Sequence, residues 1–453
     1  MPNPWAPDGL ALARRPRWPA IARLALYALV VVGPVLVMLA VARPGPNALI
    51  AAGRAVALAG AALILVQPVL AARLRWVSWP FGLPRVLGWH RVAPRLALAL
   101  LLMHPILIAW GYGTARVVLE PAGWALPLGW AALLLLGVQW FASEFRREVG
   151  LGFQTWRWGH NVLGVGLLVA ALGHSYVLGP DMSRAAFRVG WPAAFAAAAA
   201  VYLYHKLIRP LRLRRRQWMV TAVTAENEQV TTLTLTPPEG RRRFDYLPGQ
   251  FHFITLHRPG RSLPTEEHHF TISSSPTGSD AVTSTIKSVG DFTRTIPQTR
   301  PGDTAEVLGP FGRFSYLLEP EPAALVFIAG GIGITPLMSM IRHLRDTEAD
   351  RDVLLIYGNR REDDIVFRDE LDAVAAGGRP RLRIVHVLSD PDESWTGPTG
   401  YVTRSLLAEH VGDEPASRAY YLCGPPPMME RVRAGLRRIG VPKRRIHWER
   451  FAL

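Results

Sequence analysis

Two apolar stretches with a histidine at each end decide the fold of this chain: residues 90–104, HRVAPRLALALLLMH, and residues 160–174, HNVLGVGLLVAALGH. In each stretch the histidines are fourteen residues apart, which is nearly four turns of α-helix, so both fall on one helix face. At 1.5 Å per residue they stand about 21 Å apart along the axis, roughly two-thirds of a bilayer core. The spacing predicts two membrane-spanning helices with imidazoles at two matched depths.

A polar side chain inside a membrane is costly and needs a partner. Two helices with matched pairs supply two imidazoles at each depth, and histidine is a common axial ligand of haem iron. We therefore interpret four histidines as the axial ligands of two stacked haems, namely His90, His104, His160 and His174. The alternative is that they are unrelated histidines at helix ends near the headgroups.

Six segments are long and apolar enough to span a bilayer. They lie near residues 21–42, 49–71, 92–112, 124–142, 159–179 and 187–208. The first resembles a signal peptide, but its apolar run is long and begins late, which favours an uncleaved anchor. Arg54 is the one clear charge well inside a segment, and we expect it to snorkel from a helix end.

The basic residues of the chain orient this bundle. Residues 1–216 carry 23 Lys and Arg against 5 Asp and Glu, and the remainder carries 28 against 30, which gives the net charge of +16. Because the excess lies in the apolar half, membrane topology explains it better than a nucleic-acid partner. The N-terminus, the second and fourth loops and the exit are arginine-rich, so both termini are expected in the cytoplasm of a multi-pass protein of the cell membrane. His90 and His160 then form an inner pair, and His104 and His174 an outer pair.

Beyond residue 216 the pattern changes to short alternating strands, expected at residues 229–236 and 250–256. Three motifs accompany them: PGQF at 248–251, HHFTISS at 268–274 and IKSVGDFT at 286–293. Taken singly, each fits ordinary barrel strands and turns. Hydroxyls, an imidazole and an aromatic ring gathered at a strand end could equally hold a flavin and its pyrophosphate. The single cysteine, Cys423, excludes a disulfide framework and a cysteine-ligated iron–sulfur cluster.

An apolar strand at 324–329 runs into the turn GGIGITP at 330–336 and then into a helical stretch. This is the setting in which backbone N–H groups and a helix N-terminus receive a dinucleotide phosphate, although any tight strand–helix turn favours glycine. The next strand, 353–357, is followed by Arg360 and Arg361, which favour the 2′-phosphate of NADPH or form a plain solvated turn. A last strand, 419–422, leads into CGPPPMM at 423–429.

In combination these motifs resemble the ferric reductase/NADPH oxidase superfamily of transmembrane flavocytochromes, and the soluble half is similar to the ferredoxin–NADP reductase family. The likeness covers about residues 50–453. It implies a multi-domain protein in which a six-helix transmembrane bundle precedes an antiparallel β-barrel FAD domain and an α/β nucleotide-binding domain. The expected boundaries are a cytoplasmic segment at 1–20, the haem domain at 21–210, the FAD domain at 211–318 and the nucleotide domain at 319–453.

The resemblance also implies roles for single residues. His268 would meet the FAD pyrophosphate, while Phe270 and Thr271 would meet the flavin; His269 stands where relatives often have proline. The other implied FAD residues are Pro248, Gln250, Ser273, Lys287, Gly290 and Thr293. Those implied for the nicotinamide nucleotide are Gly331, Gly333, Thr335, Pro336, Arg360, Arg361, Gly424 and Pro425. Cys423 would lie beside the nicotinamide, and Phe451 would cover the flavin until the nicotinamide displaces it.

The expected function is electron transfer from cytoplasmic NADPH, with NADH as the other possible donor, through FAD and two b-type haems to an external acceptor. The outer loops hold no carboxylate or histidine cluster for bare iron, but Arg116, Arg184 and Arg188 could attract an anionic chelate. Ferric chelate reduction is therefore favoured. The alternatives are a superoxide-producing NADPH oxidase and an electron-relay module that feeds a partner protein.

Overall fold

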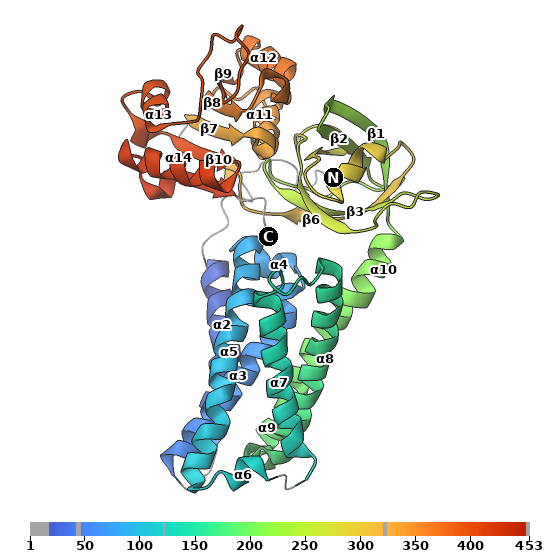
Figure 1. Cartoon of the computed structure of the whole chain (residues 1–453), viewed down its shortest axis with the longest axis vertical. Coiled ribbons are helices and arrows are strands. Elements are labelled where there is room, and N and C mark those ends of the chain that lie inside the picture. Colours follow the sequence, from blue (N-terminus) through green and yellow to red (C-terminus); the bar gives the residue numbers. More distant parts are fainter. Residues whose placement is uncertain (1–17, 42–46, 121–122, 320–323, 450–453) are drawn as a thin grey trace. The chain divides into compact units, whose positions relative to one another are not determined.

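The computed structural model describes residues 18–41, 47–120, 123–319 and 324–449 (Figure 1). Within this part of the chain, contacts separate two compact units, and the division falls between Pro210 and Leu211. The first is helical and apolar on its outside, and the second contains two sheets. We describe each unit by itself.

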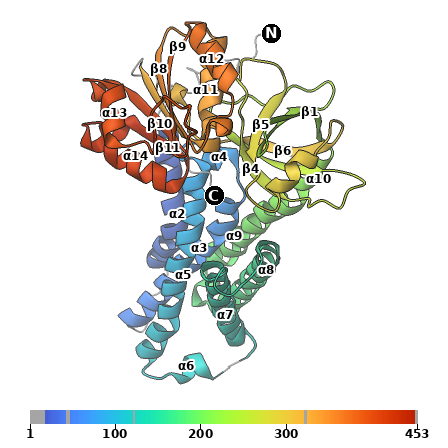
Figure 2. The ribbon, with the colours of Figure 1, turned by 45° about the horizontal axis from the view of Figure 1, so that its top comes forward.

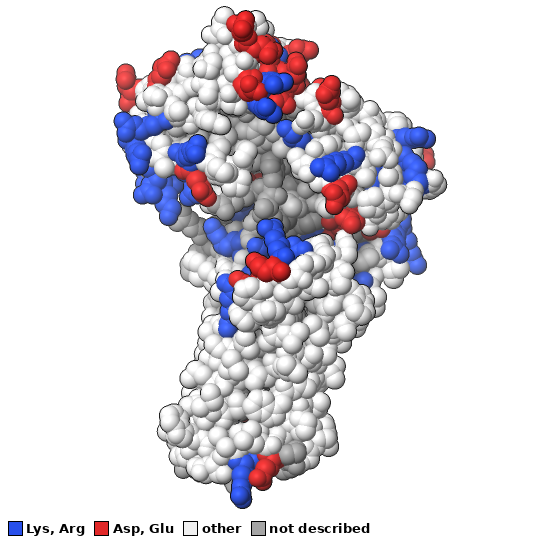
Figure 3. Space-filling model, in the orientation of Figure 1, with Lys and Arg blue, Asp and Glu red and all other residues white. Residues whose placement is uncertain are grey.

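Six helices of the first unit are long and apolar enough to cross a membrane, as the hydropathy pattern predicted. They are α2 (Trp18–Val41), α3 (Ala48–Ala71), α5 (Leu83–Tyr112), α7 (Ala125–Glu144), α8 (Phe153–Leu178) and α9 (Ala185–Leu203). Short helices α4 (Arg75–Ser78) and α6 (Arg116–Leu119) lie in the connections, and a π-helical turn, Tyr204–Ile208, joins α9 to α10 (Arg209–Arg214). On the face seen in Figure 3, charged side chains of this unit gather at its two ends and leave the middle bare.

Two of these helices begin earlier than the apolar pattern predicted. Helix α5 starts at Leu83 rather than near 92, after Gly82 with a φ of +82° and with a proline in its first turn. Helix α8 starts at Phe153 rather than near 159. Arginines in these first turns lower the local hydropathy, which concealed them in the sequence. As a result, His90 and His160 each lie seven residues, or about two turns, inside their helices.

Glycines allow the transmembrane helices to pack closely, as small residues do in membranes. A Cβ at Gly60 of α3 would lie 2.8 Å from Leu101 of α5, and a Cβ at Gly111 of α5 would lie 2.4 Å from Ile50 of α3. Helices α7 and α8 also lie side by side, in both views of the ribbon (Figures 1 and 2). The backbone of α3 therefore comes close enough to α5 to bond its side chains.

Arg54 finds its partner within the protein. Arg54 pairs with Asp181 of the last outer loop, with one N–H···O distance of 3.1 Å from its Nε, and Asp181 is buried. The two residues are 127 positions apart, so no local pattern could have announced the pair. A buried arginine needs a compensating charge, and this carboxylate supplies it.

The first half of the second unit is a six-stranded antiparallel sheet in the order β4-β3-β6-β1-β2-β5. Its strands are β1 (Trp218–Asn227), β2 (Val230–Thr236), β3 (Phe251–His257), β4 (Glu267–Thr271), β5 (Val282–Lys287) and β6 (Thr304–Phe311). The N–H of Ser273, just after β4, donates to the carbonyl of Thr283 in β5 at 2.8 Å. This bond joins the two edges of the sheet, as in the barrel that was expected. Leu233, Ile254 and Ile272 are fully buried inside it.

The second half is a parallel sheet in the order β11-β10-β7-β8-β9. Its strands are β7 (Leu325–Gly330), β8 (Asp352–Asn359), β9 (Arg381–Leu388), β10 (Ala419–Cys423) and β11 (Ile446–Glu449). Its helices are α11 (Ile334–Asp346), α12 (Arg368–Ala376), α13 (Arg404–Val411) and α14 (Pro426–Arg438). Helices α11 and α12 cover one face, and α13 and α14 cover the other (Figure 1). The strand order reverses between β7 and β10, where doubly wound sheets bind ligands at the carboxyl ends of the strands.

Candidate functional site

The four histidines of the transmembrane unit form two facing pairs, as predicted from their spacing. The ring centres of His90 and His160 are 6.1 Å apart, and those of His104 and His174 are 6.3 Å apart. Both pairs join α5 to α8, and the fourteen-residue spacing places them at two depths.

This geometry fits an iron atom between the rings of each pair. Two axial imidazoles on one iron hold their ring centres roughly 6 Å apart, because each metal–nitrogen bond is about 2 Å long. Rings of unrelated helix-end histidines would have no reason to match at both depths. The donor set, four imidazoles in an apolar bundle, is also one that ligates b-type haem.

The outer pair is oriented by the main chain. Nδ1 of His104 lies 2.9 Å from the carbonyl oxygen of Gly53, and Nδ1 of His174 lies 3.0 Å from that of Ala125. An N–H at each Nδ1 donates to its carbonyl, which leaves the Nε2 lone pair free for a metal. Gly129 makes room for this arrangement, since a Cβ there would lie 2.5 Å from Nδ1 of His174.

The inner pair has a different second partner. The side-chain amide nitrogen of Gln139 on α7 lies 3.2 Å from Nδ1 and 3.4 Å from Nε2 of His160. The indole of Trp156 packs on the same imidazole, with ring centres 5.1 Å apart. A side chain rather than a main-chain carbonyl therefore orients His160.

Three of the residues expected to bind FAD have side chains that brace the protein. The Gln250 amide accepts from the Leu247 N–H at 2.8 Å and donates to the Gly312 carbonyl at 2.9 Å. The buried Ser273 hydroxyl bonds the hydroxyls of Thr283 and Thr285, at 2.9 and 3.0 Å. The Thr293 hydroxyl accepts the N–H groups of Val289 and Gly290, at 2.9 and 2.8 Å, and so closes their turn. These residues shape the site through the backbone.

The remaining predicted FAD residues lie on β4, at the end of β5 and just after it, and in the loop before β3. His268 and Phe270 alternate on β4 and so share a face, and the His268 ring stacks on Phe292 with centres 4.0 Å apart. Its Nε2 lies 3.0 Å from a carboxylate oxygen of Glu266. Thr271 ends β4, Lys287 ends β5, and Pro248 is buried in the loop before β3. β4 can present an imidazole and an aromatic ring to a flavin nucleotide, whereas Lys287 projects from the opposite side of the sheet to its buried neighbour Ile286.

The glycine turn and the cysteine motif meet at the switch point of the parallel sheet. Ala329 of β7 pairs with Cys423 of β10, and a Cβ at Gly333 would lie 2.2 Å from the carbonyl oxygen of Cys423. Gly331 has a φ of +52°, which favours glycine. Thr335 donates its hydroxyl to the Ile332 carbonyl at 3.1 Å, and Pro336 follows it in the first turn of α11. Gly424 and Pro425 lead from β10 into α14. The glycine turn and the start of α11 thus lie at the carboxyl ends of the strands, where doubly wound sheets bind ligands.

Two acidic residues at this edge, Glu449 and Asp390, were not predicted from the sequence. Glu449 ends β11 beside Cys423, and crowding by protein raises the pKa of its carboxyl to about 8, although the residue keeps some exposure. Burial, with Glu449 nearby, also raises the pKa of the Cys423 thiol. At neutral pH both groups therefore hold their protons, which leaves this part of the edge uncharged. Phe451, the expected flavin cover, lies outside the described residues.

The second unpredicted acid is Asp390, which follows β9. The Nε atoms of Arg360 and Arg361 donate to one oxygen of its carboxylate, at 3.2 and 3.1 Å. These bonds and the arginine charges lower the pKa of Asp390. The two arginines are 71% and 58% exposed, so a nucleotide phosphate can still reach them. The parallel pairing of β8 and β9 brings the acid that follows β9 to the arginines that follow β8.

Comparisons with known proteins come from three family models that match the chain in order. The ferric reductase like transmembrane component matches residues 56–171, an FAD-binding domain matches 217–301, and the oxidoreductase NAD-binding domain matches 327–434. The transmembrane match ends before the division between the two units, and the FAD-binding match begins after it. Together with the six apolar helices, they describe a multi-pass membrane protein.

The curated relatives that match this chain match about a third to a half of it. NADH-cytochrome b5 reductase 1 of Laccaria bicolor is 37% identical over 155 residues, which is 34% of this chain and 50% of that protein. The reductase subunit of stachydrine N-demethylase from Rhizobium meliloti is 34% identical over 238 residues, which is 50% of this chain and 64% of that protein. The chain thus spans about half to two-thirds of these relatives.

Among solved structures, the FAD/NAD-binding domain of a Vibrio cholerae nitric oxide dioxygenase is similar, with a TM-score of 0.46 and 24% identity. The match covers 52% of this chain and 98% of that domain. The order of the three family models, with a transmembrane component ahead of the two nucleotide-binding domains, is not that of a soluble reductase. Together the three family models match the ferric reductase/NADPH oxidase superfamily, with a soluble half like that of ferredoxin–NADP reductases.

Proposed function

We propose that this protein transfers electrons from NAD(P)H across the membrane to an external acceptor, through FAD and two b-type haems. The observation that carries the proposal is the double pair of facing imidazoles, with ring centres 6.1 and 6.3 Å apart on the same two helices. His90 and His160 would hold the inner haem, and His104 and His174 the outer one. The family models support a nucleotide donor and a flavin in the other half.

When bound, FAD accepts two electrons as a hydride and releases them singly, and haem iron carries one electron at a time. The protein's own part is placement. The glycine turn and the start of α11 would bind the dinucleotide phosphates, while His268, Phe270 and Thr271 would hold the flavin nucleotide. Glu449 holds a proton near the nicotinamide side, and apolar helices exclude water from the imidazole pairs.

The acceptor that we favour is an anionic ferric chelate, reduced at an exposed haem edge on the outer side. Arg116, Arg184 and Arg188 lie in the outer connections, and Arg116 is exposed with a weak pairing to Glu120 at 3.5 Å. Exposed cations of this kind attract an anion without binding iron directly. Dioxygen, reduced to superoxide, is the second candidate acceptor, and a partner protein is the third.

The test compares products in liposomes that contain the purified, haem-loaded protein. With NADPH supplied on the cytoplasmic face, we expect ferrous iron from ferric citrate without oxygen, and little superoxide with oxygen. Superoxide without anaerobic ferric reduction would assign the protein as an NADPH oxidase. Flavin and haem reduction without either product would point to a partner protein as acceptor. No oxidation of either nucleotide would contradict the proposed function itself.

Nucleotide choice gives a further prediction. We propose that Arg360 and Arg361 bind the 2′-phosphate of NADPH through charge-assisted bonds, for which Asp390 competes. Replacing both arginines with glutamine should raise the KM for NADPH about tenfold or more, since such bonds contribute about 1.5–3 kcal/mol, and should change the KM for NADH little. Asp390→Asn should have the opposite effect and shift the preference toward NADPH. Steady-state kinetics with both nucleotides measure this, and equal kinetics in the unmodified protein would contradict it.

A further inference from the structure

Three polar side chains of α11 form a row that bonds the neighbouring sheet domain. Ser339, Arg342 and Asp346 are spaced i, i+3 and i+7, so they share one helix face. The Ser339 hydroxyl donates to the carbonyl of Ser274 at 2.7 Å, and Nη1 of Arg342 donates to the carbonyl of Ser273 at 2.7 Å. A carboxylate oxygen of Asp346 accepts from the Thr277 hydroxyl at 3.0 Å.

The two segments that this row connects are those expected to hold the two reactants. Residues 273–277 directly follow β4, which carries the predicted flavin contacts Phe270 and Thr271. Helix α11 directly follows the glycine turn predicted for the nicotinamide nucleotide. A shift of α11 along this row would therefore move one predicted binding site relative to the other.

Close packing beside the row leaves little room for such a shift. Gly249, in the loop before β3, has a φ of +91°. A Cβ at this glycine would lie 2.5 Å from Cε of Met340 and 2.1 Å from the Phe314 carbonyl oxygen. The helix and the loop are thus in contact at a position where only glycine fits.

Arg342 is the most constrained member of the row. Its guanidinium forms two bonds with the Glu370 carboxylate, at 2.9 and 2.5 Å, and lies over the Phe367 ring at 4.7 Å. Burial opposes ionisation of Glu370, but its bonds to Arg342 and Arg345 lower the pKa of the carboxyl overall, so it stays charged. With three of its donors engaged and a side chain only 15% exposed, Arg342 holds one geometry.

We propose that Arg342 is a positioning residue for hydride transfer, which sets the separation of nicotinamide and flavin by tying α11 to the segment after β4. The inference rests on the proposed function. In that step a hydride, one proton with two electrons, would leave the bound nicotinamide as NAD(P)⁺ and would be taken up whole by the bound flavin. Such transfers require reacting atoms about 3–3.5 Å apart, and a misplacement of about 1 Å can cost a hundredfold in rate.

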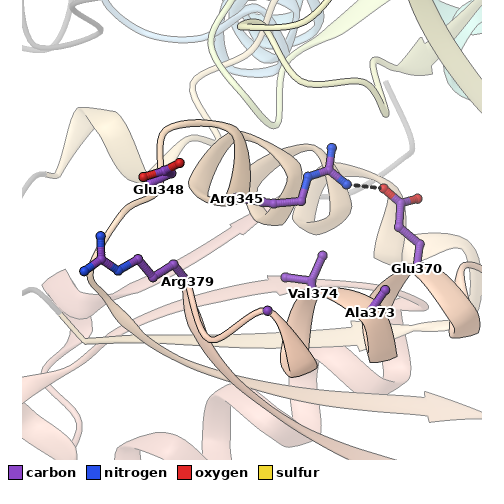
Figure 4. A pocket seen from close by; sticks show the side chains of 7 residues that line it. Arg345, Glu348, Glu370, Ala373, Val374 and Arg379 are labelled. Carbon is purple, nitrogen blue, oxygen red and sulfur yellow. Dashed lines mark hydrogen bonds and ion pairs between the residues drawn. The ribbon is translucent and has the colours of Figure 1, made fainter.

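Arg345 offers a matched control on the same helix. It bonds Glu370 at 2.9 Å (Figure 4), the carboxylate that Arg342 also bonds. Its other bonds go to Asp346. It lines a pocket of about 450 Å³ with Glu348, Glu370, Ala373, Val374, Gly377 and Arg379, all in the nucleotide-binding domain. Replacing it removes a cation beside Glu370 and leaves the Arg342 bond to Ser273 in place.

The experiment uses the full-length protein loaded with FAD and haem. Stopped-flow absorbance follows flavin reduction under anaerobic conditions, with NADPH and with NADPH deuterated at the transferred position. We expect Arg342→Met to lower the limiting rate of flavin reduction by about tenfold to a hundredfold and to raise the deuterium isotope effect. The Kd for NADPH, the FAD content and the haem spectrum should stay as in the parent protein. Arg345→Met should change the limiting rate less than about twofold.

Two milder variants keep the test decisive if Arg342→Met does not fold. Ser339→Ala removes one hydrogen bond of the row, and Arg342→Lys keeps the charge but loses the two-point hydrogen bonding to Glu370. Both variants should show smaller decreases in the limiting rate of flavin reduction. An unchanged limiting rate in all three variants, or an equal loss in Arg345→Met, would overturn the inference. If the parent protein itself shows no flavin reduction by NADPH or NADH, the proposed function fails instead.

Discussion

His104→Ala should lower the haem content from two to about one per chain and leave the remaining haem spectroscopically intact. The reason is geometric, because the His104 and His174 rings face each other at 6.3 Å and no other histidine lies at their depth. The variant would remove one of the two proposed axial ligands of the outer haem iron. Haem extraction and quantitation, with low-temperature absorbance spectra, measure the result.

The same variant should separate the two ends of the pathway. Reduction of the flavin and of the inner haem by NADPH should continue, while reduction of the external acceptor should stop. His90→Ala should instead stop electron flow before the outer haem. His205→Ala is the matched control, because His205 lies in the same unit but bonds Arg209 rather than a second histidine. Two full haems in purified His104→Ala would rule out the ligand assignment.

Gly333→Ala should abolish NAD(P)H-dependent flavin reduction almost completely. The added Cβ would lie 2.2 Å from the carbonyl oxygen of Cys423 and 2.5 Å from its carbonyl carbon, and neither backbone atom can turn aside. Overpacking of this kind costs about 1–3 kcal/mol and moves the backbone. The turn, β10 and the start of α11 would then separate by a fraction of an ångström or more. A displacement of about 1 Å lowers a positioned reaction about a hundredfold.

Nucleotide binding and stability are measured alongside the rate of flavin reduction. The Kd for NADPH should rise, while the haem spectrum should not change, since the four histidines belong to the other unit. Gly377→Ala is the control, because Gly377 ends α12 of the same domain with a φ of −70° and its Cβ would meet only ordinary contacts at 3.5 Å. Normal flavin reduction in Gly333→Ala would show that the turn tolerates the methyl group, and it would contradict the view that close approach to Cys423 requires glycine at this position.

Much of the architecture follows from local patterns in the sequence. Apolar length located all six spans, and the pairing of histidines across α5 and α8 followed from a repeated interval. Strands β2, β3, β7, β8 and β10 lie within one or two residues of their predicted ranges. Patterns of this kind work because side-chain period and burial are properties of neighbouring residues.

What the sequence did not show are partners brought together by the fold. Asp181 meets Arg54, and Asp390 meets Arg360, from positions 127 and 30 residues away. Gln139, Glu449 and Arg342 belong to the same group, since their importance comes from what they touch. Conversely, Gln250, Ser273 and Thr293 carry motif positions, yet their side chains bond the protein itself. A motif identifies a location in the fold more securely than it identifies the role of each side chain.

The difference in how the two histidine pairs are oriented has a consequence for natural variation. Positions 53 and 125 hold His104 and His174 through peptide carbonyls, which every amino acid possesses, so inherited substitutions there cannot delete the acceptor. His160 depends on the amide of Gln139, which a single codon change can remove or replace by a carboxylate. A drifting population would therefore accumulate differences in the basicity of the imidazole at the His160 depth, while the surroundings of His104 and His174 stay chemically constant across descendants.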